Sequence, residues 1–148
     1  MQNNEIKVLI FQITGEYYAA DIMEIERIIG IENTTKLPDS PSFVEGVITY
    51  EGNILPIISL AKKFNLPYGE KNQDSKIIVT KQDNTKIGII VDVVSEVKDV
   101  NIKSIENPPE ILAGISKRYI KGLIKLDTKI IIFLNLGTIL SEEERMFI

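Results

Sequence analysis

Histidine is absent from the 148-residue sequence, and its absence excludes several kinds of active site. Histidine is the side chain that most often serves as a general base or a transition-metal ligand near neutral pH. Serine triads with a histidine base and histidine-based zinc sites are therefore excluded. Cysteine is also absent, which excludes disulfides, thiol nucleophiles and thiolate metal sites and fits a reducing compartment. A carboxylate- or lysine-based enzyme stays compatible with this composition.

Tryptophan is absent too, and aromatic residues reach only 7% of the sequence. Acidic residues outnumber basic ones by 21 to 17, which gives a net charge of −4. Nucleic-acid binding requires an excess of Lys and Arg on at least one face, and bases stack on aromatic side chains. No glycine-rich phosphate loop or calcium-binding loop occurs. We therefore expect no nucleic-acid partner, no cofactor and no metal site.

Long apolar runs are missing as well, since none approaches the roughly 20 residues that cross a bilayer. The N-terminal stretch MQNNEIK is polar and lacks the basic start and apolar stretch of a secretory signal. We expect a cytoplasmic protein without direct membrane insertion. Hydrophobic residues at 44% and charged residues at 26% are typical of a soluble globular protein. The length allows a single domain with a well-buried core.

Short β-prone runs separated by turn residues dominate the sequence. Val8 to Ile13 and Tyr17 to Asp21 flank a glycine-containing turn, which predicts a hairpin. Val47 to Tyr50 and Ile54 to Ile58 flank a turn at Gly52 and predict a second hairpin. The second half of the chain has three more strand-like runs: Lys76 to Thr80, Ile87 to Val91 and Ser95 to Val100.

Two short helices complete the prediction. Leu60 to Leu66 resembles a short helix after the second hairpin. Ser141 and Glu144 have the spacing of a capping box, which predicts a C-terminal helix over residues 137–148.

An internal repeat relates the two halves of the chain. FVEGVITYEGNILPIISL, from Phe43, aligns without a gap with YIKGLIKLDTKIIIFLNL, from Tyr119, at an offset of 76 residues. Gly46 matches Gly122 within this alignment, and apolar positions coincide along it. Upstream, residues 18–22 loosely match residues 87–91 at an offset of 69. Such a repeat indicates a duplicated structural unit, although two hairpins of any β-rich protein share apolar runs.

Each half then supplies about five short strands, which can close into a small barrel without exposed sheet edges. We predict an all-β fold with short helices, built from two packed five-stranded barrels with elements around residues 7–66 and 76–136.

Three blocks of the sequence resemble a known family. FQITGEYYAADIMEIERII, KLPDSPSFVEGVITYEGNILPIISLAKKF and IGIIVDVVSEV are similar to the family of the chemotaxis coupling protein CheW, and the resemblance covers almost the whole chain. It implies one CheW-like domain over residues 1–148 with two SH3-like barrels. It also implies a non-catalytic adaptor that links the cytoplasmic tips of methyl-accepting chemoreceptors to the regulatory domain of the histidine kinase CheA.

Two charges depart from the family pattern. Glu51 stands where the family usually has the arginine of Asn-Leu-Arg-Gly, and Arg27 stands where an early glutamate is usual. We hypothesise that Arg27 and Glu51 form a swapped ion pair, which if exposed contributes at most about 1 kcal/mol and orients a contact surface. Two unrelated surface substitutions are the alternative.

The resemblance also implies a partner-binding face on the first barrel. The residues expected to border it are Ile25, Arg27, Gly46, Thr49, Glu51, Gly52 and Pro56. Ile25 could instead be a core residue, and Gly46 could be required by a partner backbone, a neighbouring strand or a bulge. Gly52 is expected to need a positive φ, and Pro56 is expected at a sheet edge or bulge.

Other functions stay open at this point. The altered motif fits a divergent CheW-like scaffold for another kinase or a motility pathway, and tandem barrels can bind peptides. A carboxylate-pair hydrolase lacks support because no spacing brings two acids together. Residues 142–144, Glu-Glu-Glu, fit the first turn of a helix.

Overall fold

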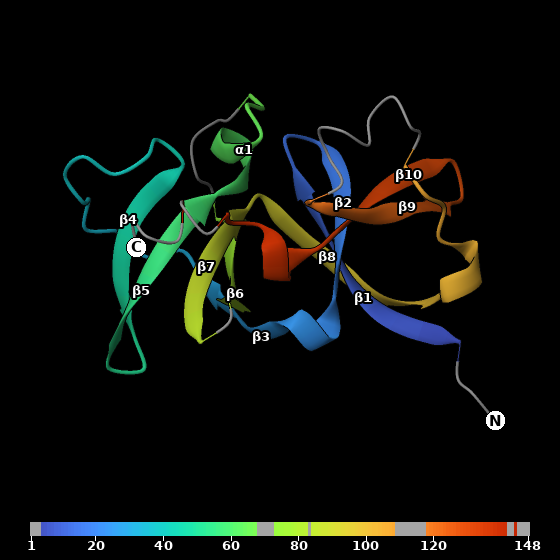
Figure 1. Ribbon diagram of the computed structural model, residues 1–148, viewed down its shortest axis with the longest axis horizontal. Coiled ribbons are helices and arrows are strands. Elements are labelled where there is room, and N and C mark those ends of the chain that lie inside the picture. The colour runs from blue at the N-terminus through green and yellow to red at the C-terminus, as the bar shows by residue number, and fades with distance from the viewer. Residues whose placement is uncertain (1–3, 68–72, 83, 109–117, 142–143, 145–148) are drawn as a thin grey trace.

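The computed structural model describes residues 4–67, 73–82, 84–108, 118–141 and 144. They form two five-stranded sheets that lie side by side (Figure 1). The first, which we call the terminal barrel, has the strand order β8-β1-β2-β10-β9. Its strands are β1 (Glu5–Ile13), β2 (Glu16–Asp21), β8 (Val93–Asn101), β9 (Ile120–Leu126) and β10 (Lys129–Leu134).

The second sheet, which we call the central barrel, has the order β3-β6-β7-β5-β4. Its strands are β3 (Ile25–Gly30), β4 (Val44–Tyr50), β5 (Asn53–Ser59), β6 (Lys76–Gln82) and β7 (Thr85–Val91). Short helical segments follow four of the strands within the described residues: η1 (Ile22–Glu24), α1 (Leu60–Lys63), η2 (Ile102–Ser104) and η3 (Leu136–Thr138). The predicted all-β fold with two five-stranded barrels and short helices is confirmed.

The barrels do not coincide with the predicted segments, because each barrel takes strands from both. The segment 7–66 supplies β1 and β2 to the terminal barrel and β3 to β5 to the central barrel. The segment 76–136 supplies β6 and β7 to the central barrel and β8 to β10 to the terminal barrel. Each five-strand unit therefore exchanges two strands with the other.

Strand register confirms the internal repeat. β5 pairs in parallel with β7, with Ile57 opposite Gly88, and β10 pairs in parallel with β2, with Phe133 opposite Ala19. Ile57 and Phe133 differ by the 76-residue offset, and Ala19 and Gly88 differ by the 69-residue offset. The two parallel ladders are thus equivalent. Each pairs a strand of one repeat unit with a strand of the other, as the antiparallel β1–β8 and β3–β6 ladders also do.

The barrels share one apolar core. A single cluster of buried side chains includes Phe11 and Ala20 of the terminal barrel and Ile58 and Ile89 of the central barrel. Two smaller clusters fill the individual barrels. Because burial of each large aliphatic or aromatic side chain contributes about 1.5–3 kcal/mol, the shared cluster fixes the barrels against one another.

The C-terminal segment packs across this junction. Ile139 and Leu140 are fully buried in the shared cluster. The Ser141 amide donates to Glu144 Oε1 at 2.7 Å, and the Glu144 amide donates to Ser141 Oγ at 3.0 Å, so the predicted capping box is present. Half of the residues in the helix predicted over 137–148 lie outside the described part of the chain. Among the others, Gly137 and Thr138 belong to the 3-10 turn η3, and residues 139–141 are not helical.

Candidate partner-binding site on the central barrel

The turn between β4 and β5 is set by backbone conformation. Glu51 has a φ of 51° and Gly52 a φ of 79°, and Tyr50 pairs with Asn53 across them. A two-residue turn with two positive φ values matches the twist of the flanking strands. The positive φ predicted for Gly52 is confirmed. The corresponding acidic residue of the second hairpin, Asp127, also has a positive φ of 56°.

Gly46 is shaped by its own chain. A Cβ on Gly46 would lie 2.4 Å from the carbonyl oxygen of Thr35, and the glycine has a φ of 139°. Thr35 exchanges two hydrogen bonds of 2.9 Å with Val47, and the β4–β5 register shifts between Val44 and Gly46. Close approach of a neighbouring segment and a bulge therefore both act here. Gly46 is buried, so it shapes the strand from beneath the surface.

Arg27 and Glu51 do form an ion pair. Arg27 Nη2 lies 3.6 Å from Glu51 Oε2, and the two side chains are 56% and 47% exposed. Exposed pairs of this kind contribute about 0.2–1 kcal/mol. The guanidinium also lies 5.8 Å from the centre of the Tyr50 ring. The position and exposure of the pair suit a role in orienting a contact more than in stabilising the barrel.

Three further residues, Glu26, Tyr50 and Lys86, are connected to this ion pair. We call these three residues, together with Arg27 and Glu51, the hairpin cluster. Lys86 Nζ lies 3.0 Å from Glu26 Oε1 and 3.7 Å from Glu51 Oε1. The Tyr50 hydroxyl donates to Glu26 Oε2 at 2.8 Å. The cluster therefore holds two positive and two negative charges in one connected network.

Protonation in the hairpin cluster follows from these contacts. The Tyr50 hydrogen bond, followed by the contact with Lys86, lowers the pKa of Glu26 below its ordinary value. The hydrogen bond to Glu26 raises the pKa of Lys86. Burial, and then the hydrogen bond to Glu26, raises the pKa of the Tyr50 hydroxyl. Glu26 and Lys86 are therefore both ionised near neutral pH, and none of these three pKa values is moved toward 7 as a general base requires.

An apolar row lies on the outer face of the same hairpin. Thr49 is paired with Ile54, and Val47 is paired with Pro56, so these side chains share one side of the β4–β5 hairpin. Ile54 is 69% exposed. Thr49 is also exposed, whereas Val47 and Pro56 are half-buried. This row, with Ile54 as its most exposed side chain, extends the surface that the hairpin cluster begins.

Pro56 is not on an edge strand, in contrast to the expectation. β5 lies inside the sheet between β4 and β7. Val47 gives its amide and carbonyl to Thr35, so the Val47–Pro56 pair carries no hydrogen bond. The parallel ladder with β7 begins only at Ile57. An interior strand tolerates the missing amide of Pro56 because no neighbour pairs with it.

The seven predicted site residues thus fall into two groups. The residues exposed on the hairpin or beside it are Arg27, Thr49, Glu51 and Gly52. The residues that are buried or half-buried are Ile25, Gly46 and Pro56, of which Pro56 lies on the outer face of the hairpin with Ile54. Ile25 is half-buried and packs against the shared core, which agrees with its core alternative.

Sequence reasoning missed Glu26, Tyr50, Lys86 and Ile54. Glu26 and Tyr50 directly adjoin Arg27 and Glu51 in the chain, so proximity alone could have suggested them. Lys86 is different, because it reaches the hairpin only through the pairing of β7 with β5. No local pattern predicts that pairing.

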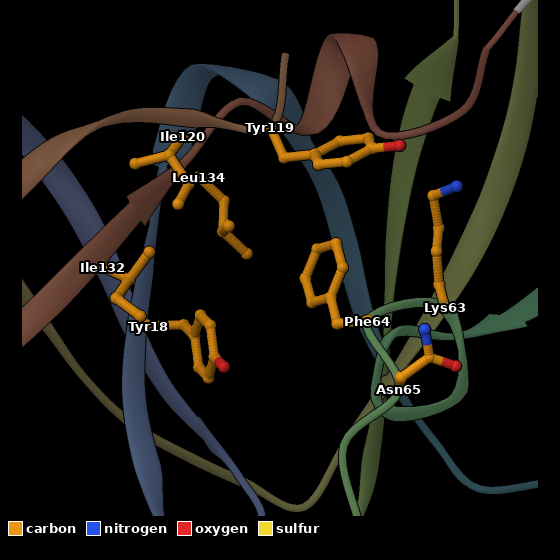
Figure 2. Close-up of a pocket in the computed structure, with 8 residues that line it drawn as sticks. All are labelled: Tyr18, Lys63, Phe64, Asn65, Tyr119, Ile120, Ile132 and Leu134. Carbon is orange, nitrogen blue, oxygen red and sulfur yellow. The ribbon is translucent and has the colours of Figure 1, made fainter. Parts of the chain in front are cut away.

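A second feature is a pocket of about 310 Å³ between the terminal barrel and α1 (Figure 2). Its walls are Tyr18, Lys63, Phe64, Asn65, Tyr119, Ile120, Ile132 and Leu134. The Phe64 and Tyr119 rings lie 5.5 Å apart and bridge the two barrels. Lys63 Nζ lies 2.6 Å from Glu144 Oε2. The mostly apolar lining of this pocket suits an apolar group and not a polar substrate.

Within the described residues, no group of three or more Asp or Glu side chains is placed to hold a metal ion. Across the same part of the chain, no helix has the length and apolar character needed to span a membrane. The arrangement of charges and apolar side chains on the β4–β5 hairpin can make contacts, and nothing in it prepares a nucleophile. The fold places the chain in the class of all-β domains built from two five-stranded barrels.

Comparison with known proteins specifies this class further. The family model described as the CheW-like domain matches residues 7–144. The chain is 29% identical to the chemotaxis protein CheW of Treponema pallidum, over 97% of this chain and 87% of that protein. It is 33% identical to that of Thermotoga maritima, over 93% and 89% of the two chains. The chain belongs to the CheW-like family.

A solved structure supports the same conclusion. The crystal structure of the scaffolding protein TtCheW from Thermoanaerobacter tengcongensis has a TM-score of 0.87 to this chain, at 33% identity. The match covers 97% of this chain and 92% of the other.

Proposed function

We propose that the protein is a non-catalytic adaptor of bacterial chemotaxis that couples the cytoplasmic tips of methyl-accepting chemoreceptors to the histidine kinase CheA. It acts in the cytoplasm, without a cofactor, and contacts the regulatory domain of the kinase. The names of its relatives, chemotaxis protein CheW and scaffolding protein TtCheW, support this role. The fold does too, since it presents surfaces and no catalytic constellation among the described residues.

The exposed β4–β5 hairpin is the observation that carries the proposal. It combines a connected group of four ion-paired charges with Ile54, an apolar side chain that is 69% exposed. Interfaces typically surround apolar anchors with polar groups that are already oriented. Because the charges of the hairpin cluster neutralise one another, a partner can cover them without burying an unpaired charge.

Arg27 and Glu51 are expected to set the orientation in which a partner binds this surface. Their order is the reverse of the order that the CheW pattern usually shows, so the partner of this chain is expected to present an acid near Arg27 and a base near Glu51. Charge pairs at the rim of an interface set orientation and discriminate between partners more than they add affinity.

Binding measurements test the proposal. The wild-type chain is titrated with the CheA regulatory domain and with a receptor-tip fragment from the same source. Arg27→Glu is expected to weaken kinase binding about tenfold. Lys7→Glu is the matched control, because Lys7 is also exposed and paired, with Asp99 at 2.9 Å, on the terminal barrel. Folded wild-type protein that binds neither partner contradicts the proposal.

A second candidate function is a divergent scaffold for another kinase or a motility pathway. The reversed charge order at Arg27 and Glu51 favours it, since partner choice depends on such charges. Restoring the usual order with Arg27→Glu and Glu51→Arg in one chain distinguishes the candidates. If the wild-type chain ignores the CheA regulatory domain and the double variant binds it, the divergent scaffold is supported.

A further inference from the structure

β4 ends the sheet of the central barrel and has an incomplete outer edge (Figure 1). Within the described part of the chain, Thr35 pairs with that edge at Val47, through two hydrogen bonds of 2.9 Å, and the Thr34 hydroxyl donates to the Glu45 carbonyl at 3.2 Å. Backbone groups two residues apart in a strand point the same way, so the amide and carbonyl of Thr49 also point outward. Among the described residues, none hydrogen-bonds to them. Thr49 is exposed, and its cross-strand neighbour is the exposed Ile54.

The equivalent edge of the terminal barrel differs at one position. Glu106 pairs with Leu123 of β9 through hydrogen bonds of 2.9 and 2.7 Å, as Thr35 does with Val47. The next outward residue is Lys125, whose Nζ lies 3.3 Å from Glu106 Oε2. A lysine on an edge strand opposes the addition of another strand. The β9 edge therefore carries such a residue, and the β4 edge has the uncharged, β-prone Thr49 in its place.

We propose that the β4 edge at Thr49 binds an extended segment of a partner protein, which adds a strand to the central barrel. This inference rests on the proposed function and specifies how the partner docks. The segment hydrogen-bonds to the amide and carbonyl of Thr49. An apolar side chain of the segment, on the face shared with Ile54, covers that isoleucine. The end of the segment near the turn meets the Arg27–Glu51 pair, which sets its direction.

Strand addition fits these features better than a helix does. An outward-pointing amide and carbonyl of one residue, in line with an existing two-bond bridge, match the repeat of an antiparallel ladder. The edge is short, so main-chain bonds fix the register of the segment. Ile54 supplies an apolar side-chain contact that adds affinity, and the hairpin cluster sets the direction of the segment.

Amide hydrogen exchange tests the main-chain contact. The full chain is compared free and saturated with the CheA regulatory domain. Exchange at the Thr49 amide is expected to slow at least tenfold in the complex, while exchange at the Lys125 amide stays unchanged. If the complex forms and the Thr49 amide exchanges as in the free chain, the inference is overturned and the proposed function stands. If the chain binds neither the kinase domain nor a receptor-tip fragment, both are overturned.

Reciprocal substitutions supply the second test. Thr49→Lys gives β4 the edge residue of β9 and is expected to weaken kinase binding at least tenfold. Lys125→Thr is expected to leave binding unchanged, and Thr49→Val, which keeps an uncharged β-prone edge, to lower it less than threefold. Thermal denaturation of each variant confirms folding. Equal effects of Thr49→Lys and Lys125→Thr would overturn the inference.

Discussion

The β4–β5 and β9–β10 hairpins have the same skeleton and different surfaces. Both are bulged one residue before a glycine, and both glycines, Gly46 and Gly122, lie against the carbonyl of a crossing segment. At the turn, Glu51 belongs to a four-charge cluster, whereas the equivalent Asp127 forms no ion pair among the described residues. The duplicated features set the fold, and the unduplicated ones distinguish the surface that we assign to partner binding.

The residue at the bulge forms an ion pair with a connecting segment in both hairpins, but with opposite charge. Glu45 of β4 pairs with Lys62 of α1 at 3.0 Å. Lys121, its equivalent on β9, pairs with Glu24 of η1 at 3.2 Å. The sign of the charge differs because each bulge faces a different connecting segment. Equivalent positions in the two barrels therefore share geometry without sharing chemistry.

The largest expected effect comes from separating the two repeat units. A cut between residues 70 and 71 leaves β1 to β5 in one fragment and β6 to β10 in the other, so neither fragment contains all strands of either barrel. We expect each fragment alone to lack native structure and the mixture to recover it. Amide NMR spectra check this. Native-like dispersion in either fragment alone would contradict the exchange of strands.

Truncation of equivalent core residues should be the next largest effect. Ile58 and Leu134 differ by the repeat offset and are 0% and 1% exposed in the shared core. Each change to alanine is expected to lower the free energy of unfolding by about 2–5 kcal/mol, through lost burial and a cavity. Urea denaturation measures both. A loss below about 1 kcal/mol for one of them would show that the two barrels do not contribute equally to the stability of the shared core.

The two glycines should respond unequally to alanine. In Gly46→Ala, the Cβ meets a backbone carbonyl at a φ of 139°, so we expect a loss of about 2–4 kcal/mol. In Gly122→Ala, the Cβ lies 2.4 Å from Ile105 Cγ2, a side-chain atom, and 2.9 Å from the Glu106 carbonyl oxygen. Partial relaxation of Ile105 should keep this loss smaller. Thermal denaturation gives the order, and the reverse order would contradict the account.

Alanine substitution should also destabilise the turn of the β4–β5 hairpin more than the turn of the β9–β10 hairpin. Gly52→Ala forces a side chain into a φ of 79° and is expected to cost about 1–2 kcal/mol. Thr128→Ala, at the equivalent position of the second turn, is expected to change stability by less than about 0.5 kcal/mol, because that residue has no positive φ. Urea denaturation of both variants makes the comparison, and equal losses would contradict it.

The smallest effect concerns protonation of Glu26. Because the folded state lowers its pKa below the ordinary value of 4.5, the contacts of Glu26 stabilise the protein above that value. This contribution is lost as the pH falls through the folded pKa. Tyr50→Phe removes the hydrogen bond that is the main cause. The stability difference between wild type and variant should therefore shrink from about pH 7 to pH 3 in urea denaturation; a constant difference would argue against it.

Much of the fold could be predicted, because local signals carry it. Alternating apolar runs, the turn at Gly52 and the repeat predicted the hairpins, and the Arg27–Glu51 pair followed from two departures from the family pattern. The assignment of strands to barrels could not be predicted in this way. The offsets of 76 and 69 residues show which strands are equivalent, but equivalence leaves open which copy pairs with which.

The unpredicted part of the site has the same origin. Lys86 reaches Glu51 only because β7 pairs with β5 across the two repeat units. Pro56 was expected at an edge because proline lacks an amide, and its actual place depends on where the ladder to β7 begins. Both outcomes are decided by long-range pairing.

The central claim is that the β4–β5 hairpin, and not its β9–β10 equivalent, receives the kinase. An NMR titration of the isotope-labelled chain with unlabelled CheA regulatory domain tests it most directly. We predict that the largest amide shifts map to Arg27, Thr49, Glu51 and Ile54, with little change at Lys125, Asp127 and Ile130. Shifts concentrated on the β9–β10 hairpin, or no shifts at saturating kinase domain, would contradict the claim.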